Sequence, residues 1–143
     1  MDLLKRIKDR EVVIGVVGLG YVGLPLILEF VEKNFSTIGF DIDAAKVQQL
    51  NDGNSYIKHI SGERIRQAHS RKLFRATDDF SELKNTDCIL VCVPTPLNKH
   101  REPDISYILN TSETISQYLQ NGQLVVLESS TYPGTTEEIM RPT

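Results

Sequence analysis

Short apolar segments alternate with longer segments of helical periodicity along this chain, and this alternation restricts its possible folds more than any other feature. The apolar segments are residues 12–18, 36–41, 73–78, 87–93 and 123–129. Most of them lack the polar alternation of a half-exposed sheet, whereas strands covered by helices on both faces are apolar throughout. We therefore expect an α/β fold with a doubly wound parallel sheet.

The intervening segments carry apolar residues at helical spacing. In residues 21–34 one stripe contains Leu24, Ile27, Leu28 and Val31. In residues 104–122 the repeat contains Ile105, Ile108, Leu109, Ile115 and Leu119, followed by an Asn-Gly stop. Both segments predict helices. A third helix should end at Gly53, and "SGER" could cap a fourth helix over residues 61–70.

Length and charge narrow the functional classes. A chain of 143 residues is the size of one domain. A net charge of −3 provides no basic surface for nucleic acid or an anionic membrane. No apolar run reaches the roughly 20 residues that span a bilayer, and the N-terminus lacks the apolar segment of a signal peptide. We expect a cytoplasmic protein without nucleic-acid or membrane partners.

The cysteines and histidines do not suggest a metal site. Cys88 and Cys92 fall in one apolar segment, where the period of two places both on the same side of a strand as small apolar residues. The three histidines lie in polar, loop-like surroundings without a second ligand at metal-binding spacing. We expect neither a disulfide nor a bound metal ion.

The segment "VGLGYVGLP" contains glycines at positions 18, 20 and 23, between the first strand and the first long helix. Gly18 would permit a tight turn, Gly20 would let the backbone approach a pyrophosphate, and Gly23 would let the helix pack closely on the sheet. Phosphates would then bind free amides at the helix N-terminus. Pro25 would lie in the first helical turn, where an N–H is dispensable. The alternative is a glycine-rich turn without a ligand.

An acidic residue in the expected place favours a dinucleotide site. Asp41 ends the second strand about 20 residues after the glycines, where the fingerprint has a carboxylate that binds the adenosine ribose. Its charge would repel the 2′-phosphate of NADP, so NAD is the expected cofactor. We expect this carboxylate to be exposed and to contribute little to packing. Lys46 is either a polar contact beside that ribose or a solvated lysine on the helix surface.

Four stretches of the chain together resemble one family. They are "VGLGYVGLPL", "GFDIDAAKVQQLNDGNSYIKHI", "CVPTPLNKHREPDISYI" and "LVVLESSTYPGTTEE". The chain resembles the N-terminal NAD-binding domain of the UDP-glucose and GDP-mannose dehydrogenases over nearly its whole length. "SYIKHI", "REPDISYI" and "ESSTYPGTT" most resemble the UDP-N-acetylglucosamine and N-acetylgalactosamine 6-dehydrogenases.

The resemblance implies a Rossmann-like domain over residues 1–143 that stops before the family's sixth strand. The family's central helix and UDP-binding domain would lie outside this chain. The implied cofactor contacts are Gly18, Leu19, Gly20, Tyr21, Val22, Gly23, Asp41, Lys46, Thr95 and Thr131. Thr95 could instead be a hydroxyl of a rigid Pro-Thr-Pro turn, and Thr131 a cap or turn hydroxyl before the next helix.

The resemblance also implies a reaction. Family members oxidise the C6 alcohol of a nucleotide sugar to a carboxylate with two NAD+, and the threonine matching Thr131 helps to hold the attacking water. The catalytic cysteine of the family has no counterpart in Cys88 or Cys92, so we expect this piece to be inactive alone. The other hypotheses are a UDP-glucose or UDP-N-acetylmannosamine 6-dehydrogenase domain, or a non-catalytic NAD-binding module. An uncovered sheet edge would favour self-association into a homo-oligomer.

Overall fold

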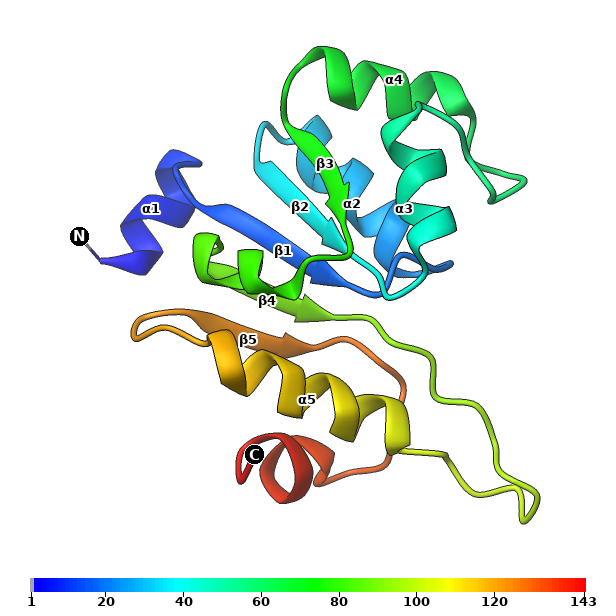
Figure 1. The fold of residues 1–143 in the computed structure, drawn as a ribbon. Coiled ribbons are helices and arrows are strands. Elements are labelled where there is room, and N and C mark those ends of the chain that lie inside the picture. The colour runs from blue at the N-terminus through cyan, green and yellow to red at the C-terminus, as the bar shows by residue number, and fades with distance from the viewer. Residues whose placement is uncertain (1) are drawn as a thin grey trace.

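The computed structural model describes residues 2–143, which form one five-stranded sheet between two layers of helices (Figure 1). The strands are β1 (Val13–Val17), β2 (Ser36–Phe40), β3 (Phe74–Thr77), β4 (Cys88–Val91) and β5 (Leu124–Leu127). All neighbouring strands are parallel, in the order β3-β2-β1-β4-β5. The predicted doubly wound α/β fold is confirmed, and each strand lies inside the segment predicted for it.

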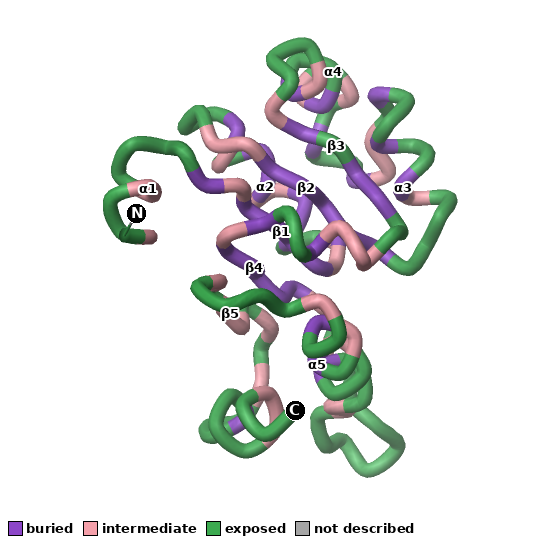
Figure 2. Tube along the Cα trace, turned by 60° about the vertical axis from the view of Figure 1, so that its left-hand side comes forward, coloured by how far each residue is buried: buried purple, intermediate pink, exposed green. Residues whose placement is uncertain are grey.

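The central strands are buried on both faces, as their continuous apolar sequences predict (Figure 2). In β4, Cys88 and Leu90 belong to one apolar cluster of the core, and Ile89 and Val91 belong to the other. Cys92 follows in the first cluster, so both cysteines lie on the same side of the sheet, and both are free thiols. Successive residues of β4 thus point to opposite faces of the sheet, and both faces are covered by apolar side chains, so the strand shows no alternation of polar and apolar residues.

The helices that cover the first face follow the predicted pattern. They are α2 (Gly23–Glu32), α3 (Ala44–Asn51) and α4 (Gly62–Ser70). The α2 stripe of Leu24, Ile27, Leu28 and Val31 is buried, as expected. Asp43 caps α3 by accepting the Ala45 N–H at 3.0 Å, and Ser61 caps α4 by accepting the Arg64 N–H at 3.4 Å. Caps of this kind satisfy backbone donors that have no partner within the helix.

On the second face, α5 (Ser106–Tyr118) only partly follows its predicted stripe. Ile108 and Ile115 are buried, but Leu109 is 37% exposed and Leu119 is 46% exposed. Figure 1 shows α5 along one side of the β4–β5 end of the sheet, next to the C-terminal segment. The short π-helical segment η2 (Thr136–Met140) contacts α5 there, where the sequence predicted a helix. The buried face of α5 therefore includes fewer residues than the apolar stripe that its sequence predicts.

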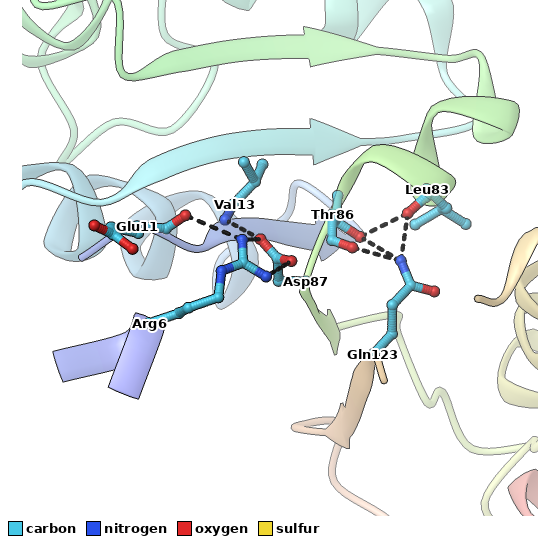
Figure 3. Close-up of polar contacts among 7 residues, drawn as sticks. All are labelled: Arg6, Glu11, Val13, Leu83, Thr86, Asp87 and Gln123. Carbon is cyan, nitrogen blue, oxygen red and sulfur yellow. Dashed lines mark hydrogen bonds and ion pairs between the residues drawn. The ribbon is translucent and has the colours of Figure 1, made fainter. Parts of the chain in front are cut away.

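Two elements were not predicted, and both hold the amino ends of strands (Figure 3). They are α1 (Leu3–Asp9) and the 3₁₀ helix η1 (Phe80–Asn85). From α1, Arg6 makes two bonds to the Asp87 carboxylate, at 2.6 and 2.9 Å, and Asp87 also accepts the Val13 N–H at 2.8 Å. The Gln123 amide donates to the carbonyls of Leu83, at 2.8 Å, and Thr86, at 2.5 Å. Residues far apart in sequence thus meet just before β4.

Across residues 2–143, every helix is too short or too polar to cross a bilayer.

Candidate functional site

A cleft of about 600 Å³ lies at the carboxyl ends of the strands. It is lined by the residues that follow β1, β2, β4 and β5, and by one side of α5. The strand order changes direction between β1 and β4, because the chain proceeds from β1 to β2 and β3 and then returns to the other side of β1. Ligands of doubly wound sheets bind at this kind of switch point.

The three glycines of the turn between β1 and α2 have different steric surroundings. Gly18 has a φ of 97°, and a Cβ there would lie 2.6 Å from the Cys92 carbonyl oxygen. A Cβ at Gly23 would lie 1.8 Å from the Gly18 carbonyl oxygen, so glycine allows α2 to approach the turn. A Cβ at Gly20 would meet no atom within 4 Å. The fold itself requires glycine at positions 18 and 23, whereas a side chain at position 20 would meet only open space.

Backbone donors converge at the start of α2. The Leu24 N–H closes the first turn by donating to the Gly20 carbonyl at 3.1 Å. The N–H groups of Gly20, Tyr21 and Val22 find no backbone or side-chain acceptor within residues 2–143. Val22, at the N-cap, provides no side-chain cap. Free amides at the positive end of a helix are a binding site for phosphate groups.

Asp41 lies in the cleft but is buried, contrary to our expectation of an exposed carboxylate. It is only 9% exposed. Its Oδ2 accepts the Leu19 N–H at 2.9 Å, and its Oδ1 accepts the Asp43 N–H at 2.9 Å. The carboxylate therefore ties the glycine turn to the β2–α3 turn and contributes to the structure of the site. Each oxygen retains a second lone pair for a further donor, such as a ribose hydroxyl.

Lys46 lines the cleft from the first turn of α3. Its Nζ lies 5.7 Å from the centroid of the Tyr56 ring, close enough for a cation–π contact. The side chain is half-buried, lines the cleft and packs on Tyr56, so it is not a freely solvated lysine on the helix surface. Its contact with the ribose stays a prediction.

The two threonines implied by the resemblance are placed differently. Thr95 is half-buried and lines the cleft. Thr131 lies just beyond the cleft wall, which is formed there by Ser129 and Ser130. The Thr131 hydroxyl makes only a long contact, at 3.5 Å, with the Tyr132 carbonyl oxygen. Because η2 begins at Thr136, Thr131 is not its N-cap.

Several cleft residues were not predicted from the sequence. Ile42 follows Asp41 directly and is 83% exposed, so an apolar side chain borders the carboxylate. Phe80 comes from η1, and Tyr107 and Thr111 come from α5. An isoleucine directly after the acidic residue of the fingerprint, and a Tyr and Thr four residues apart on a helix near the carboxyl edge, were signals that could have identified them.

Neither cysteine is suited to nucleophilic chemistry. Burial raises the pKa of the Cys88 thiol, and burial, with a smaller contribution from Glu128, raises the pKa of the Cys92 thiol to about 11. The thiolate is the reactive form, so burial disfavours the reactive form of both groups at neutral pH. In the part of the chain that the structure describes, no three His, Cys, Asp or Glu side chains gather as a metal site would require.

These features fit a dinucleotide. Free amides, open space at Gly20 and a carboxylate with remaining acceptor capacity stand together at the switch point, which defines a Rossmann-type dinucleotide-binding domain. Residues 12–143 match the model of the UDP-glucose/GDP-mannose dehydrogenase family, NAD binding domain. The chain belongs to this family.

Relatives and solved structures agree with this assignment. The UDP-N-acetyl-D-glucosamine 6-dehydrogenase of Salmonella typhi is 38% identical over 128 residues, covering 90% of this chain and 29% of the relative. The UDP-N-acetyl-D-mannosamine dehydrogenase of Pyrococcus horikoshii is 33% identical, covering 90% and 31%. The structure of GDP-mannose dehydrogenase from Pseudomonas aeruginosa has a TM-score of 0.86 at 27% identity, covering 90% and 31%. This chain spans about a third of the length of these proteins.

Proposed function

We propose that this chain is the NAD-binding part of a nucleotide-sugar 6-dehydrogenase that oxidises the C6 alcohol of a UDP-N-acetylhexosamine to the uronic acid. The observation that carries the cofactor assignment is the open space at Gly20 beside amides without acceptors. The substrate proposal rests on similarity to the UDP-N-acetyl-D-glucosamine 6-dehydrogenases and on the sequence motifs that resemble that branch. A UDP-N-acetylmannosamine substrate is the second candidate, because the UDP-N-acetyl-D-mannosamine dehydrogenase of Pyrococcus horikoshii is 33% identical.

In this proposal the chain's own groups bind and orient the dinucleotide. The turn from Gly18 to Gly23 holds the pyrophosphate with its main-chain amides, at the positive end of α2. Asp41 accepts hydrogen bonds from the adenosine ribose, and its charge disfavours a 2′-phosphate. Lys46 and Thr95 provide polar contacts from opposite walls of the cleft. The bound NAD+ supplies the hydride acceptor.

Catalysis requires groups beyond the cofactor site. A base or positioned water must take the alcohol proton, and a thiolate must add to the aldehyde before the second oxidation. Because Cys88 and Cys92 are buried with raised pKa values, the thiol in this proposal comes from residues outside 1–143. Thr131, next to the cleft wall, is proposed to help hold the water that hydrolyses the resulting thioester.

Assembly into a homo-oligomer is also part of the proposal. The edge strand β5 has an exposed Leu124, and Leu109 on α5 and Leu119, which directly follows α5, are also exposed. Burying such apolar surface against a second copy is favourable. Light scattering at increasing concentration tests this part, and a strictly monomeric chain at high concentration contradicts it.

Calorimetric titration with NAD+, NADP+ and UDP-N-acetylglucosamine tests the cofactor assignment. NAD+ should bind, NADP+ should bind more weakly because of Asp41, and the sugar nucleotide should bind little to this chain alone. Equal affinity for NADP+ contradicts the role of Asp41, and no affinity for NAD+ contradicts the proposed function. Activity of a protein that joins residues 1–143 to a cysteine-containing second domain distinguishes the enzyme from a non-catalytic NAD-binding module.

A further inference from the structure

The connection between α3 and α4 contacts the glycine turn at two points. The Tyr56 hydroxyl donates a hydrogen bond to the Leu19 carbonyl oxygen. Three residues later, the His59 ring centroid lies 6.1 Å from that of Tyr21. Tyr56 itself is not among the residues that line the cleft. A segment that does not enter the site therefore contacts two residues of the turn that does.

The hydrogen bond from Tyr56 to the Leu19 carbonyl holds a rigid group, the Leu19–Gly20 peptide. Leu19 is fully buried, its N–H donates to Asp41, and its carbonyl accepts from Tyr56. The Leu19–Gly20 peptide is trans and planar, so its carbonyl and its N–H point in opposite directions. Fixing the Leu19 carbonyl consequently fixes the direction of the Gly20 N–H, away from Tyr56. That N–H is one of the donors without an acceptor in the described chain.

We propose that Tyr56 is a positioning residue for the cofactor: its hydroxyl holds the Leu19–Gly20 peptide in the orientation that presents the Gly20 N–H to the pyrophosphate. This inference rests on the proposed binding of NAD+ by the glycine turn. Asp41 holds the preceding peptide through the Leu19 N–H. The two side chains thus fix both peptide groups that flank Leu19, and Gly20 itself, without a side chain, contributes no restraint.

The surroundings of Tyr56 keep its hydroxyl a donor. Burial is the largest cause that raises the Tyr56 pKa above its ordinary value, and the negative charges of Asp41 and Asp43 raise it further. The hydroxyl therefore stays protonated, and available as a donor, at neutral pH. The Lys46 ammonium group lies over the same ring, with its Nζ 5.7 Å from the ring centroid. Tyr56 therefore contacts two of the proposed cofactor-binding residues, Leu19 and Lys46.

The variant Tyr56→Phe tests the proposal because it removes the hydroxyl and keeps the ring under Lys46. A single hydrogen bond contributes about 0.5–1.5 kcal/mol, so the Kd for NAD+ should rise about twofold to twelvefold. Tyr118→Phe is the matched control, because Tyr118 ends α5 and packs against the second core cluster, away from the glycine turn. Its Kd should equal that of the unaltered chain. Titrations are run at a temperature where thermal melts show all three proteins fully folded.

A second readout separates positioning from simple stabilisation. In ¹⁵N-labelled chain, saturating NAD+ should move the Gly20 amide proton resonance, and this induced shift should be smaller in Tyr56→Phe. A merely structural role lowers the melting temperature and leaves both the Kd and the induced shift unchanged, which overturns the positioning proposal while the proposed function stands. Absence of NAD+ binding by the unaltered chain overturns both.

Discussion

Replacing Gly20 by alanine should separate binding from folding more cleanly than any other change in the turn. The new Cβ would meet no protein atom within 4 Å, and the φ of Gly20 lies outside the left-handed region that favours glycine. Under these conditions an alanine restricts the unfolded chain and stabilises the protein by about 0.4–1 kcal/mol. The free energy of unfolding should therefore stay the same or rise by up to about 1 kcal/mol.

The effect on NAD+ should be large. The methyl group would occupy the space through which the pyrophosphate approaches the backbone, and it would hold the phosphates away from the free amides of Gly20, Tyr21 and Val22. Hydrogen bonds to a charged group are each worth about 1.5–3 kcal/mol. Losing two of them corresponds to a rise in Kd of at least about a hundredfold.

Isothermal titration with NAD+ and urea unfolding of the same preparations measure both quantities. Gly23→Ala is the matched control, because its Cβ would lie 1.8 Å from the Gly18 carbonyl oxygen. This overlap should destabilise the fold by about 3 kcal/mol or more. If Gly20→Ala binds NAD+ with the affinity of the unaltered chain, the phosphates do not lie at this turn and our assignment of the site is wrong.

Three further changes test other parts of the structure. Asp41→Ala should weaken NAD+ binding and also lower the free energy of unfolding by about 2 kcal/mol, because the Leu19 N–H loses its buried acceptor; urea unfolding identical to that of the unaltered chain would contradict this. Asp87→Ala should cost about 2 kcal/mol by leaving the Val13 N–H without a partner, with unchanged NAD+ affinity in the same titration. Because the raised pKa of Cys92, about 11, exceeds its ordinary value near 9, the folded state loses stability as pH rises from about 9 to 11. Urea unfolding across this range should show the loss, and Cys92→Ala should lack that component.

The sequence predicted the sheet because its signals are local. Each central strand is apolar on both faces, and the glycines at 18 and 23 are required by contacts with the backbone around them. The predicted cofactor residues mostly line one cleft, because parallel strands bring the residues that follow them to a common edge. Their roles toward NAD+ remain predictions.

The features that sequence reasoning missed depend on partners distant in the chain. The buried Asp41 carboxylate binds the Leu19 N–H, 22 residues earlier in the chain. The Tyr56 hydroxyl binds the Leu19 carbonyl, 37 residues earlier than Tyr56. The helix α1 has no buried residue of its own, and it is fixed by Arg6 binding Asp87. Leu109 and Leu119 fit the helical period, but periodicity alone does not tell how wide the packed face is.

The contacts at the amino end of β4 have a consequence for synthesis on the ribosome. The strand β1 sits at the centre of the sheet, yet one of its two neighbours, β4, begins only at Cys88. The carbonyls of Leu83 and Thr86 receive their hydrogen bonds from the Gln123 side chain only after that residue has been synthesised. A nascent chain that has emerged only through β3 can pair β1 with β2 and β3, but the opposite edge of β1 stays open to other chains until β4 emerges. Until β4 emerges, the nascent chain therefore exposes an unpaired edge of its most central strand, which is a site for aggregation.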